Sequence, residues 1–463
     1  MLKLQDRSMI AIKKIKLLFR FLLLDIFFIK RRINILESRE KLDREEMNKL
    51  QDSLLLKSFL IAKKKLPAYQ GLKVPAESCD IKKYISNNCP VITKSDLLTK
   101  REQYYPNNGK SHLLQIVGRS SGTTGTPLEI FRSYDSILWE NSFVKRHWQS
   151  ICDVKTIKRA TLRGDQIDDT AQNMKTSWIF NEVESQLILS SRHLTNDTCK
   201  DFISVINQFT PNILQAYPST AFQLAQYAIT NQLIIKVPFV FTASEMLYPY
   251  QREVIEKTIG QVYDFYGMAE RVAMATECNF KNLHINSDYS YVEILDDNDN
   301  PTDEEGFIVG TTLHNHVMPL IRYKLSDRTK WKKGHCECGS NYPMIEPISG
   351  KFEDIIYDPD GTPISPSLIT FAFKGVSNIE KSQVAQITAE QWVIRIVPGN
   401  NYSPYNGEQI LNNLKAYVGK KINAEIIIVT DIARTNAGKY RWVLNETTTK
   451  IDKLETVANT TKE

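Results

Sequence analysis

The sequence predicts an α/β protein, with a large N-terminal domain whose sheets are covered by helices and a small mobile C-terminal α+β domain. Between residues 160 and 245, short apolar runs alternate with helical stretches, which is the pattern of a sheet covered on both faces. Near the end of the chain, strand-like stretches at 391–397 and 424–429 flank a helical stretch at 407–418. A length of 463 residues is enough for more than one hydrophobic core.

The composition is that of an ordinary globular protein, with 42% apolar and 24% charged residues. A net charge of +6 is too small and too dispersed to indicate nucleic-acid binding, and no helix-turn-helix, zinc-finger or RNA-binding motif accompanies it. The seven cysteines lack the dense, even spacing of a disulfide framework. We therefore expect a protein of the reducing cytoplasm.

The first seventy residues are predicted to be helical. Residues 10–35 combine basic side chains with apolar runs, but Arg20 and Asp25 interrupt them well short of the ~20 apolar residues that span a membrane. No signal-peptide cleavage site is evident. Two interpretations stay open: a basic amphipathic helix at the inner face of a membrane, or a helix packed on its own domain. Residues 37–63 are expected to continue the helix, which Pro67 closes.

Residues 118–127 contain five hydroxyl-bearing residues and three glycines, without an aliphatic side chain among them. Glycines let several backbone N–H groups converge on an anion, and hydroxyls add neutral donors. A short strand is expected at 113–117, so the loop would leave a sheet edge, where α/β proteins bind nucleotides. The spacing is not that of a Walker loop, because no lysine follows. Taken alone, such a run is also typical of a flexible connector.

Three further stretches follow in order, at residues 266–270, 322–327 and 434–442. Residues 261–266 alternate as a strand does, so 267–270 should lie just past its carboxyl end, where ligands gather. An aromatic ring there can stack on adenine, and a carboxylate can share Mg²⁺ with a triphosphate. A strand at 320–323 is expected to lead to a turn that carries Asp327.

The four stretches together resemble, in order, the motifs of the adenylate-forming superfamily, which holds acyl- and aryl-CoA synthetases, peptide-synthetase adenylation domains and luciferases. The resemblance extends from about residue 113 to 445. Residues 438–442 and 336–339 are similar to the phenylacetate-CoA ligase branch, and more narrowly to its CapK-like members, which are associated with capsular polysaccharide biosynthesis.

This resemblance implies a nucleotide site and assigns roles to its residues. Tyr266 would stack on adenine, Asp327 would bind ribose, and Glu270 would share Mg²⁺ with the triphosphate. The superfamily usually has Thr or Ser before this glutamate, whereas the chain has Ala269, so one hydroxyl contact to phosphate is missing or is made by the glycine loop. The full set of implied nucleotide-binding residues is Ser120, Ser121, Gly122, Thr123, Thr124, Gly125, Ser244, Glu245, Tyr266, Gly267, Asp327 and Lys351.

Residues 350–356 resemble the hinge of the superfamily, which implies an N-terminal domain at 1–353, with a helical lead-in at 1–70, and a C-terminal lid at 354–463. Glu353 is the expected pivot. Lys351 stands where the family usually has arginine. The ammonium group of lysine cannot form the paired hydrogen bonds that a guanidinium forms. Lys439, beside Gly438 on a short loop, is the predicted catalytic residue, since a compact cation suits a phosphorus centre that gains charge.

Cys278, His284, Cys336 and Cys338 form a second constellation. Two cysteines one residue apart beside a glycine are a frequent half of a tetrahedral thiolate site, and a nearby cysteine and histidine can supply the other half. His335 is a competing fourth ligand, and four unrelated residues in a reduced protein are the alternative. The similarity to branch members favours a structural Zn²⁺, because four protein ligands leave no open position for water.

The resemblance implies an ATP-dependent ligase that adenylates an acyl or aminoacyl carboxylic acid, releasing pyrophosphate and later AMP. The acceptor would be CoA, a carrier thiol, or an amine or hydroxyl of a surface sugar in bacterial polysaccharide biosynthesis. Two alternatives stay open: an aryl-CoA ligase of catabolism, and a non-catalytic nucleotide-binding scaffold in a polysaccharide assembly complex, which Ala269 and Lys351 favour.

Overall fold

The structure is a computed structural model, and it describes residues 28–76, 79–106, 115–119, 128–154, 156–163, 177–348, 356–361, 378–418, 421–432 and 442–447, with a few positions between 363 and 376. Several predictions lie outside the described residues. They concern the boundary at residue 353 and the side chains of Ser120, Ser121, Gly122, Thr123, Thr124, Gly125, Lys351, Glu353 and Lys439.

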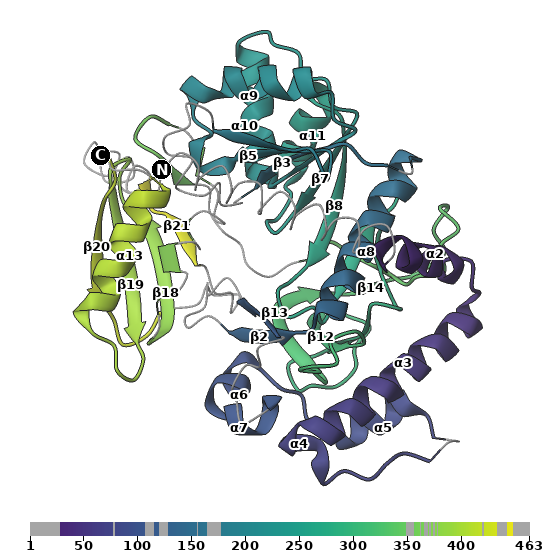
Figure 1. The fold of residues 1–463 in the computed structure, drawn as a ribbon. Coiled ribbons are helices and arrows are strands. Elements are labelled where there is room, and N and C mark those ends of the chain that lie inside the picture. Colours follow the sequence, from purple (N-terminus) through teal and green to yellow (C-terminus); the bar gives the residue numbers. More distant parts are fainter. Residues whose placement is uncertain are drawn as a thin grey trace, which may run out of the picture.

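The N-terminal part is helical, as predicted, but it is broken into several helices (Figure 1). They are α2 (Lys30–Arg39), α3 (Arg44–Lys65), α4 (Pro67–Gln70), α5 (Ile81–Asn88), α6 (Lys94–Thr99) and α7 (Arg101–Tyr104). The prediction of one continuous helix over 37–63 is wrong, because Asp43 starts a new helix through reciprocal bonds with Glu46. Pro67 does not close a helix but opens α4, where its fixed φ suits the first turn.

Most of the basic, apolar N-terminal segment lies outside the described residues, which begin at residue 28. Among the helices that the structure does describe, none has both the length and the apolar character needed to cross a bilayer.

A ten-stranded mixed sheet forms the centre of the large domain. Its strands are β3 (Arg159–Arg163), β4 (Trp178–Asn181), β5 (Gln186–Ser190), β6 (Ile213–Ala216), β7 (Phe239–Ala243), β8 (Gln261–Gly267), β9 (Met274–Glu277), β10 (Leu283–Ile285), β14 (Trp331–Lys332) and β15 (Met344–Ile345). Their order is β14-β15-β10-β9-β8-β7-β6-β3-β5-β4. The adjacent strands β5, β3, β6, β7 and β8 run parallel to one another, and the remaining pairs are antiparallel.

Helices cover both faces of this sheet, which confirms the predicted fold class (Figure 1). One face packs on α9 (Asn196–Phe209), α10 (Pro218–Thr230) and α11 (Pro249–Thr258), and the other packs on α8 (Tyr134–Cys152). A short 3-10 helix at Ser191–His193 precedes α9 in the chain. Alternation along the strands decides which side chain meets which face. Val240 joins the core under α9 to α11, while its neighbour Phe241 packs with Trp148 of α8.

Two smaller sheets extend the domain toward the N-terminal helices. One is the hairpin of β1 (Ile116–Arg119) and β2 (Glu129–Arg132); the other is antiparallel and contains β11 (Ser290–Leu295), β12 (Gly306–Thr312) and β13 (Tyr323–Thr329). The prediction that Asp327 lies in a turn is wrong, because β13 continues through it. Register shifts there: residues 325–327 of β13 stand opposite Ile308 alone, and such a bulge re-aims side chains.

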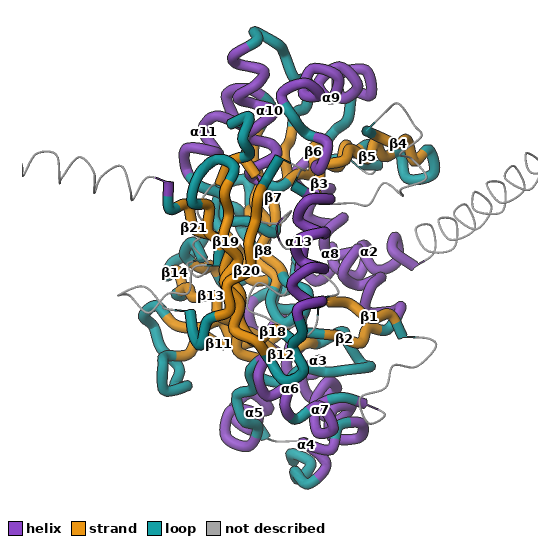
Figure 2. The backbone as a smooth tube through the Cα atoms, turned by 90° about the vertical axis from the view of Figure 1, so that its left-hand side faces the viewer, coloured by secondary structure: helices purple, strands orange, loops and turns teal. Residues whose placement is uncertain are grey.

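The C-terminal domain is a separate α+β unit, on the left in Figure 1 and facing the viewer in Figure 2. It contains β16 (Ile356–Tyr357), β17 (Pro363–Ile364), β18 (Ile379–Gln386), β19 (Gln391–Pro398), α13 (Pro404–Tyr417), β20 (Asn423–Ile428) and β21 (Val443–Asn445). Four of these strands form a sheet in the order β20-β19-β18-β21. Its own core includes Trp392, Ile410 and Trp442, so this domain does not depend on the large sheet for burial.

Candidate functional site

The carboxyl ends of β6, β7 and β8 meet at one edge of the large sheet, because these neighbouring strands are parallel. Tyr217 follows β6, Ser244 follows β7, and Gly267 closes β8. Glu270 comes three residues later, in the turn that leads to β9. The described members of the predicted site on these strands therefore share the edge at which open α/β sheets bind ligands.

Tyr266 and Asp327 meet although they are 61 residues apart. The Tyr266 hydroxyl donates to Oδ2 of Asp327 at 2.8 Å. Burial raises the pKa of Tyr266 well above its usual value, and the Asp327 carboxylate raises it further, so Tyr266 stays a proton donor. This bond fixes the carboxylate from one side and leaves its Oδ1 free of any hydrogen bond to the described residues. The pair thus combines an aromatic ring with an acceptor oxygen, as a nucleoside requires.

The Glu270 side chain is buried, with 9% of the residue exposed. Its only hydrogen bond to described residues is a long one, 3.4 Å, from the Tyr323 hydroxyl to Oε1. Within the described residues no Lys, Arg or His forms an ion pair with it. A buried carboxylate is costly unless it is paired or binds a metal, so Glu270 is suited to hold a divalent cation.

The loop after β7 is strained and polar. Ser244 adopts a left-handed φ of 73°, which is uncommon for a residue other than glycine and typical of functional loops. Its Oγ accepts a hydrogen bond of 2.7 Å from Nη2 of Arg163, whose guanidinium lies 5.4 Å from the ring centroid of Tyr217. Glu245 accepts the backbone N–H of Ser219 at 3.2 Å and so stabilises the start of α10.

Cys278, His284, Cys336 and Cys338 come together, and their ligand atoms all lie within 4.8 Å of one another. The Cys278 and Cys336 sulfurs are 3.6 Å apart, and the Cys338 sulfur is 3.5 Å from Nε2 of His284. Both distances are close to the edge of a tetrahedron around Zn²⁺, about 3.8 Å for a Zn–S bond of about 2.3 Å. His335 is exposed and does not belong to this cluster.

The surroundings of the cluster orient its ligands. Nδ1 of His284 donates to the Tyr342 carbonyl at 2.9 Å, which leaves the lone pair of Nε2 directed at the cluster. Nδ2 of Asn282 donates to the Cys336 sulfur at 3.3 Å. Burial alone would raise the pKa of Cys336, but hydrogen bonds from Cys338 and Asn282 lower it to about 6. The residues therefore fit a four-ligand zinc ion, although no ion is part of the structure.

Arg132 and Arg163 contact loops at this edge of the large sheet but were not indicated by sequence patterns. Arg132 donates to the carbonyl of Ala269, which is 137 residues away, and Arg163 reaches Ser244 across 81 residues. The one available signal was position: each arginine ends a strand, and Arg163 ends a parallel strand of the large sheet, where ligands collect.

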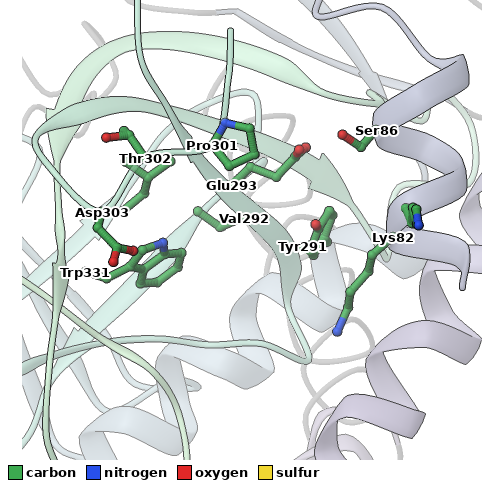
Figure 3. Close-up of a pocket in the computed structure, with 11 residues that line it drawn as sticks. Lys82, Ser86, Tyr291, Val292, Glu293, Pro301, Thr302, Asp303 and Trp331 are labelled. Atoms are coloured by element: carbon green, nitrogen blue, oxygen red, sulfur yellow. The ribbon is translucent and has the colours of Figure 1, made fainter.

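A separate hollow of about 470 Å³ lies between α5 and the three-stranded sheet (Figure 3). It contains none of the predicted site residues. Three of its charged side chains form ion pairs within the protein: Lys82 with Asp52, Glu293 with Arg322, and Asp303 with Lys333. Because these charges are already neutralised, we assign no ligand to this hollow.

Solved structures share the fold of this chain. 2-Hydroxyisobutyryl-CoA ligase in complex with 2-HIB-AMP and CoA, in its thioesterification state, has a TM-score of 0.59 at 18% identity, covering 91% of this chain and 94% of that chain. The open conformation of the same ligase has a TM-score of 0.54 at 18% identity, covering 88% and 93%. The chain has the fold of the adenylate-forming ligases.

Two sequence comparisons narrow the class. Residues 356–446 match the CapK C-terminal domain. Protein CapK of Staphylococcus aureus is 24% identical over 372 residues, which are 78% of this chain and 80% of that protein. The chain therefore resembles CapK over most of its length and has the fold of the adenylate-forming ligases, so the predicted resemblance is confirmed.

Proposed function

We propose that the chain is an ATP- and Mg²⁺-dependent ligase that adenylates a carboxylic acid and then transfers the acyl or aminoacyl group to an acceptor. The observation that carries this proposal is the buried Glu270 carboxylate, which forms no ion pair with a described residue and stands beside the carboxyl edge of β8. An incoming Mg²⁺ with its triphosphate would satisfy this carboxylate.

The nucleotide would be held by residues of three elements. The ring of Tyr266 offers a face for adenine, and the free Oδ1 of Asp327 offers an acceptor for the ribose hydroxyls. Glu270 would hold Mg²⁺, which supplies charge neutralisation at the phosphates. We assign the phosphates to the glycine-rich loop at 120–127, with Lys351 as a further contact, on the strength of the sequence resemblance.

The reaction needs no nucleophile from the protein. A carboxylate oxygen of the acid attacks the α-phosphorus of ATP, the bond to the β-phosphate oxygen breaks, and pyrophosphate leaves. The acceptor thiol, amine or hydroxyl then attacks the acyl carbon, loses its proton, and AMP leaves. Lys439 is assigned to the negative charge that develops in the first step, and Glu353 to the rotation of the lid between the steps.

Two classes of acceptor are supported by different relatives. The ligase with the similar fold is named for a CoA product, which supports CoA. The similarity to CapK supports a carrier thiol or a sugar amine or hydroxyl in surface polysaccharide biosynthesis. We favour the second class, because the C-terminal domain, which closes on the acceptor in this proposal, matches CapK.

One observation favours a non-catalytic scaffold as the second candidate. Ala269 supplies no hydroxyl where the superfamily usually has one. A scaffold would still bind the nucleotide, whereas a ligase would also release pyrophosphate.

The test is incubation of the purified chain with ATP, Mg²⁺ and hydroxylamine across a panel of acyl, aryl and amino acids. We expect acid-dependent hydroxamate and pyrophosphate with at least one acid, and none when the acid or Mg²⁺ is left out. ATP binding without pyrophosphate for every acid would favour the scaffold. With the active acid, CoA consumption then separates a CoA acceptor from a sugar or carrier acceptor.

We also assign the four-ligand cluster to a structural Zn²⁺. Three thiolates and a neutral imidazole suit zinc better than a hard cation, and they leave no coordination position for a water molecule.

A further inference from the structure

We propose that Arg132 binds the phosphate groups of the nucleotide in addition to the proposed Mg²⁺. It would replace the hydroxyl that the chain lacks at Ala269. This inference rests on the proposed function, because it names a further binding residue of the same site.

Arg132 is placed by the hairpin that flanks the glycine-rich loop. It ends β2 and stands opposite Ile116 of β1, while Gly118 pairs with Ile130. A Cβ atom at Gly118 would lie 2.2 Å from Cζ of Arg132. The guanidinium therefore lies directly over Gly118, and only glycine allows this approach.

The same guanidinium reaches the turn that carries Glu270. Its Nη2 donates to the Ala269 carbonyl, so the group bridges the strand before the glycine-rich loop and the residue before the predicted magnesium ligand. No side chain at position 269 competes for this space, because alanine ends at Cβ.

The charge of Arg132 is poorly compensated. Burial lowers its pKa, and the neighbouring Arg271 lowers it further, against Glu140, Tyr289 and Glu270, which raise it. Among the described residues, its buried Nε has no hydrogen-bond partner and no carboxylate forms an ion pair with the guanidinium. Glu140, whose charge also acts on Arg132, already accepts the Tyr289 hydroxyl and lies 3.6 Å from Nε of Arg271.

A half-buried cation with an unused donor is stabilised by an incoming anion. With Mg²⁺ bound, Glu270 would compensate the charge of Arg132 less, and the guanidinium would be available to donate to a phosphate group. A guanidinium offers N–H donors and a full charge, whereas the usual hydroxyl offers one neutral donor. The substitution at Ala269 is thereby compensated from another strand.

The test compares MgATP with adenosine, which lacks phosphates. Binding of each and acid-dependent pyrophosphate release are measured for wild type, Arg132→Ala, Arg132→Lys and Ala269→Ser, and for the Arg132→Ala and Ala269→Ser double variant. Arg44→Ala, an exposed arginine on α3, is the matched control. We expect Arg132→Ala to weaken MgATP binding about 10- to 100-fold while adenosine binding is unchanged, as for a lost charged hydrogen bond.

Ala269→Ser should recover more affinity in the Arg132→Ala background than it adds to wild type, because the hydroxyl and the guanidinium would serve one phosphate. Arg132→Lys, which keeps the charge but not the fork, should lie between wild type and Arg132→Ala. If Arg132→Ala is too unstable to fold, Arg132→Lys and Gly118→Ala, which displaces the guanidinium, carry the same comparison.

A purely structural clamp would lower the thermal stability and weaken MgATP and adenosine equally, or weaken neither, and that result would overturn the inference. The outcome is separable from the proposed reaction. If wild type binds MgATP but releases no pyrophosphate with any acid, the proposed reaction fails, while the ratio of MgATP to adenosine affinity still decides the role of Arg132.

Discussion

The sheet edge that carries Glu270 and the cluster around Cys278 lie at opposite ends of the same short strand, β9. Glu270 and Asp327 keep acceptor oxygens that form no ion pair with the described residues. The four ligand atoms of the cluster instead lie within 4.8 Å of each other. Open acceptors allow a ligand to bind and leave, whereas a closed set holds one ion permanently. The following predictions test whether this division is correct.

Glu270→Gln should have the largest effect on chemistry, because it removes the charge proposed to hold Mg²⁺ without changing the size of the side chain. We expect acid-dependent pyrophosphate release to fall ~10²- to 10³-fold, with an unchanged midpoint of thermal unfolding. Glu304→Gln, at an exposed position, is the control. Normal release by Glu270→Gln would mean that the open carboxylate is not part of the nucleotide site.

Lys439→Ala tests whether chemistry also depends on the C-terminal domain. The lysine should stabilise charge only in the adenylation transition state, so we expect a ~10²-fold or larger loss of adenylate formation. ATP binding, and transfer from supplied acyl-adenylate, should stay nearly normal. The measurement is both half-reactions on both proteins, and equal damage to the two steps would contradict the assigned role.

Cys338→Ser should act on stability rather than on nucleotide binding. We expect near-stoichiometric zinc in wild type and its loss in the variant, with a decrease of ~3 kcal/mol or more in unfolding free energy, since a structural metal contributes folding energy. Cys79→Ser, an exposed cysteine outside the cluster, is the control. If metal analysis finds no zinc in protein purified without chelators, the cluster does not hold a permanent ion.

The smallest expected effect concerns His147, which packs on the end of β9. Burial lowers its pKa from 6.5 to about 4, and Nε2 donates to the Glu277 carbonyl at 2.8 Å. Its neutral form is favoured in the folded state, so its contribution is complete above pH 6.5 and is lost as the pH falls toward 4. His147→Gln keeps a donor but cannot titrate.

Between pH 7 and pH 4, wild type should therefore lose up to ~3 kcal/mol more unfolding free energy than His147→Gln. Denaturant unfolding at several pH values measures it. A difference independent of pH would show that His147 titrates normally in the folded protein.

Local pattern was sufficient for the strand end at 266–270. It indicated each half of the Cys and His set as a short motif, whereas the resemblance to relatives was needed to join the two halves. It was not sufficient for Asp327, whose place in β13 follows from a bulge against the partner strand β12. Nor could it find Arg132, since the space over Gly118 exists only after β1 and β2 pair. Contacts across sheets are decided by tertiary packing, which no local period encodes.

The metal ligands also enclose a part of the chain. His284 and Cys336 lie on either side of β11, β12 and β13, so the segment with Asp327 forms a loop that the ion would close like a cross-link. In a chain-entropy description, a cross-link across about 50 residues raises the free energy of the unfolded chain by about 4 kcal/mol. Loss of the ion would free both ends of this loop. The register that presents Asp327 to Tyr266 would then depend on strand pairing alone.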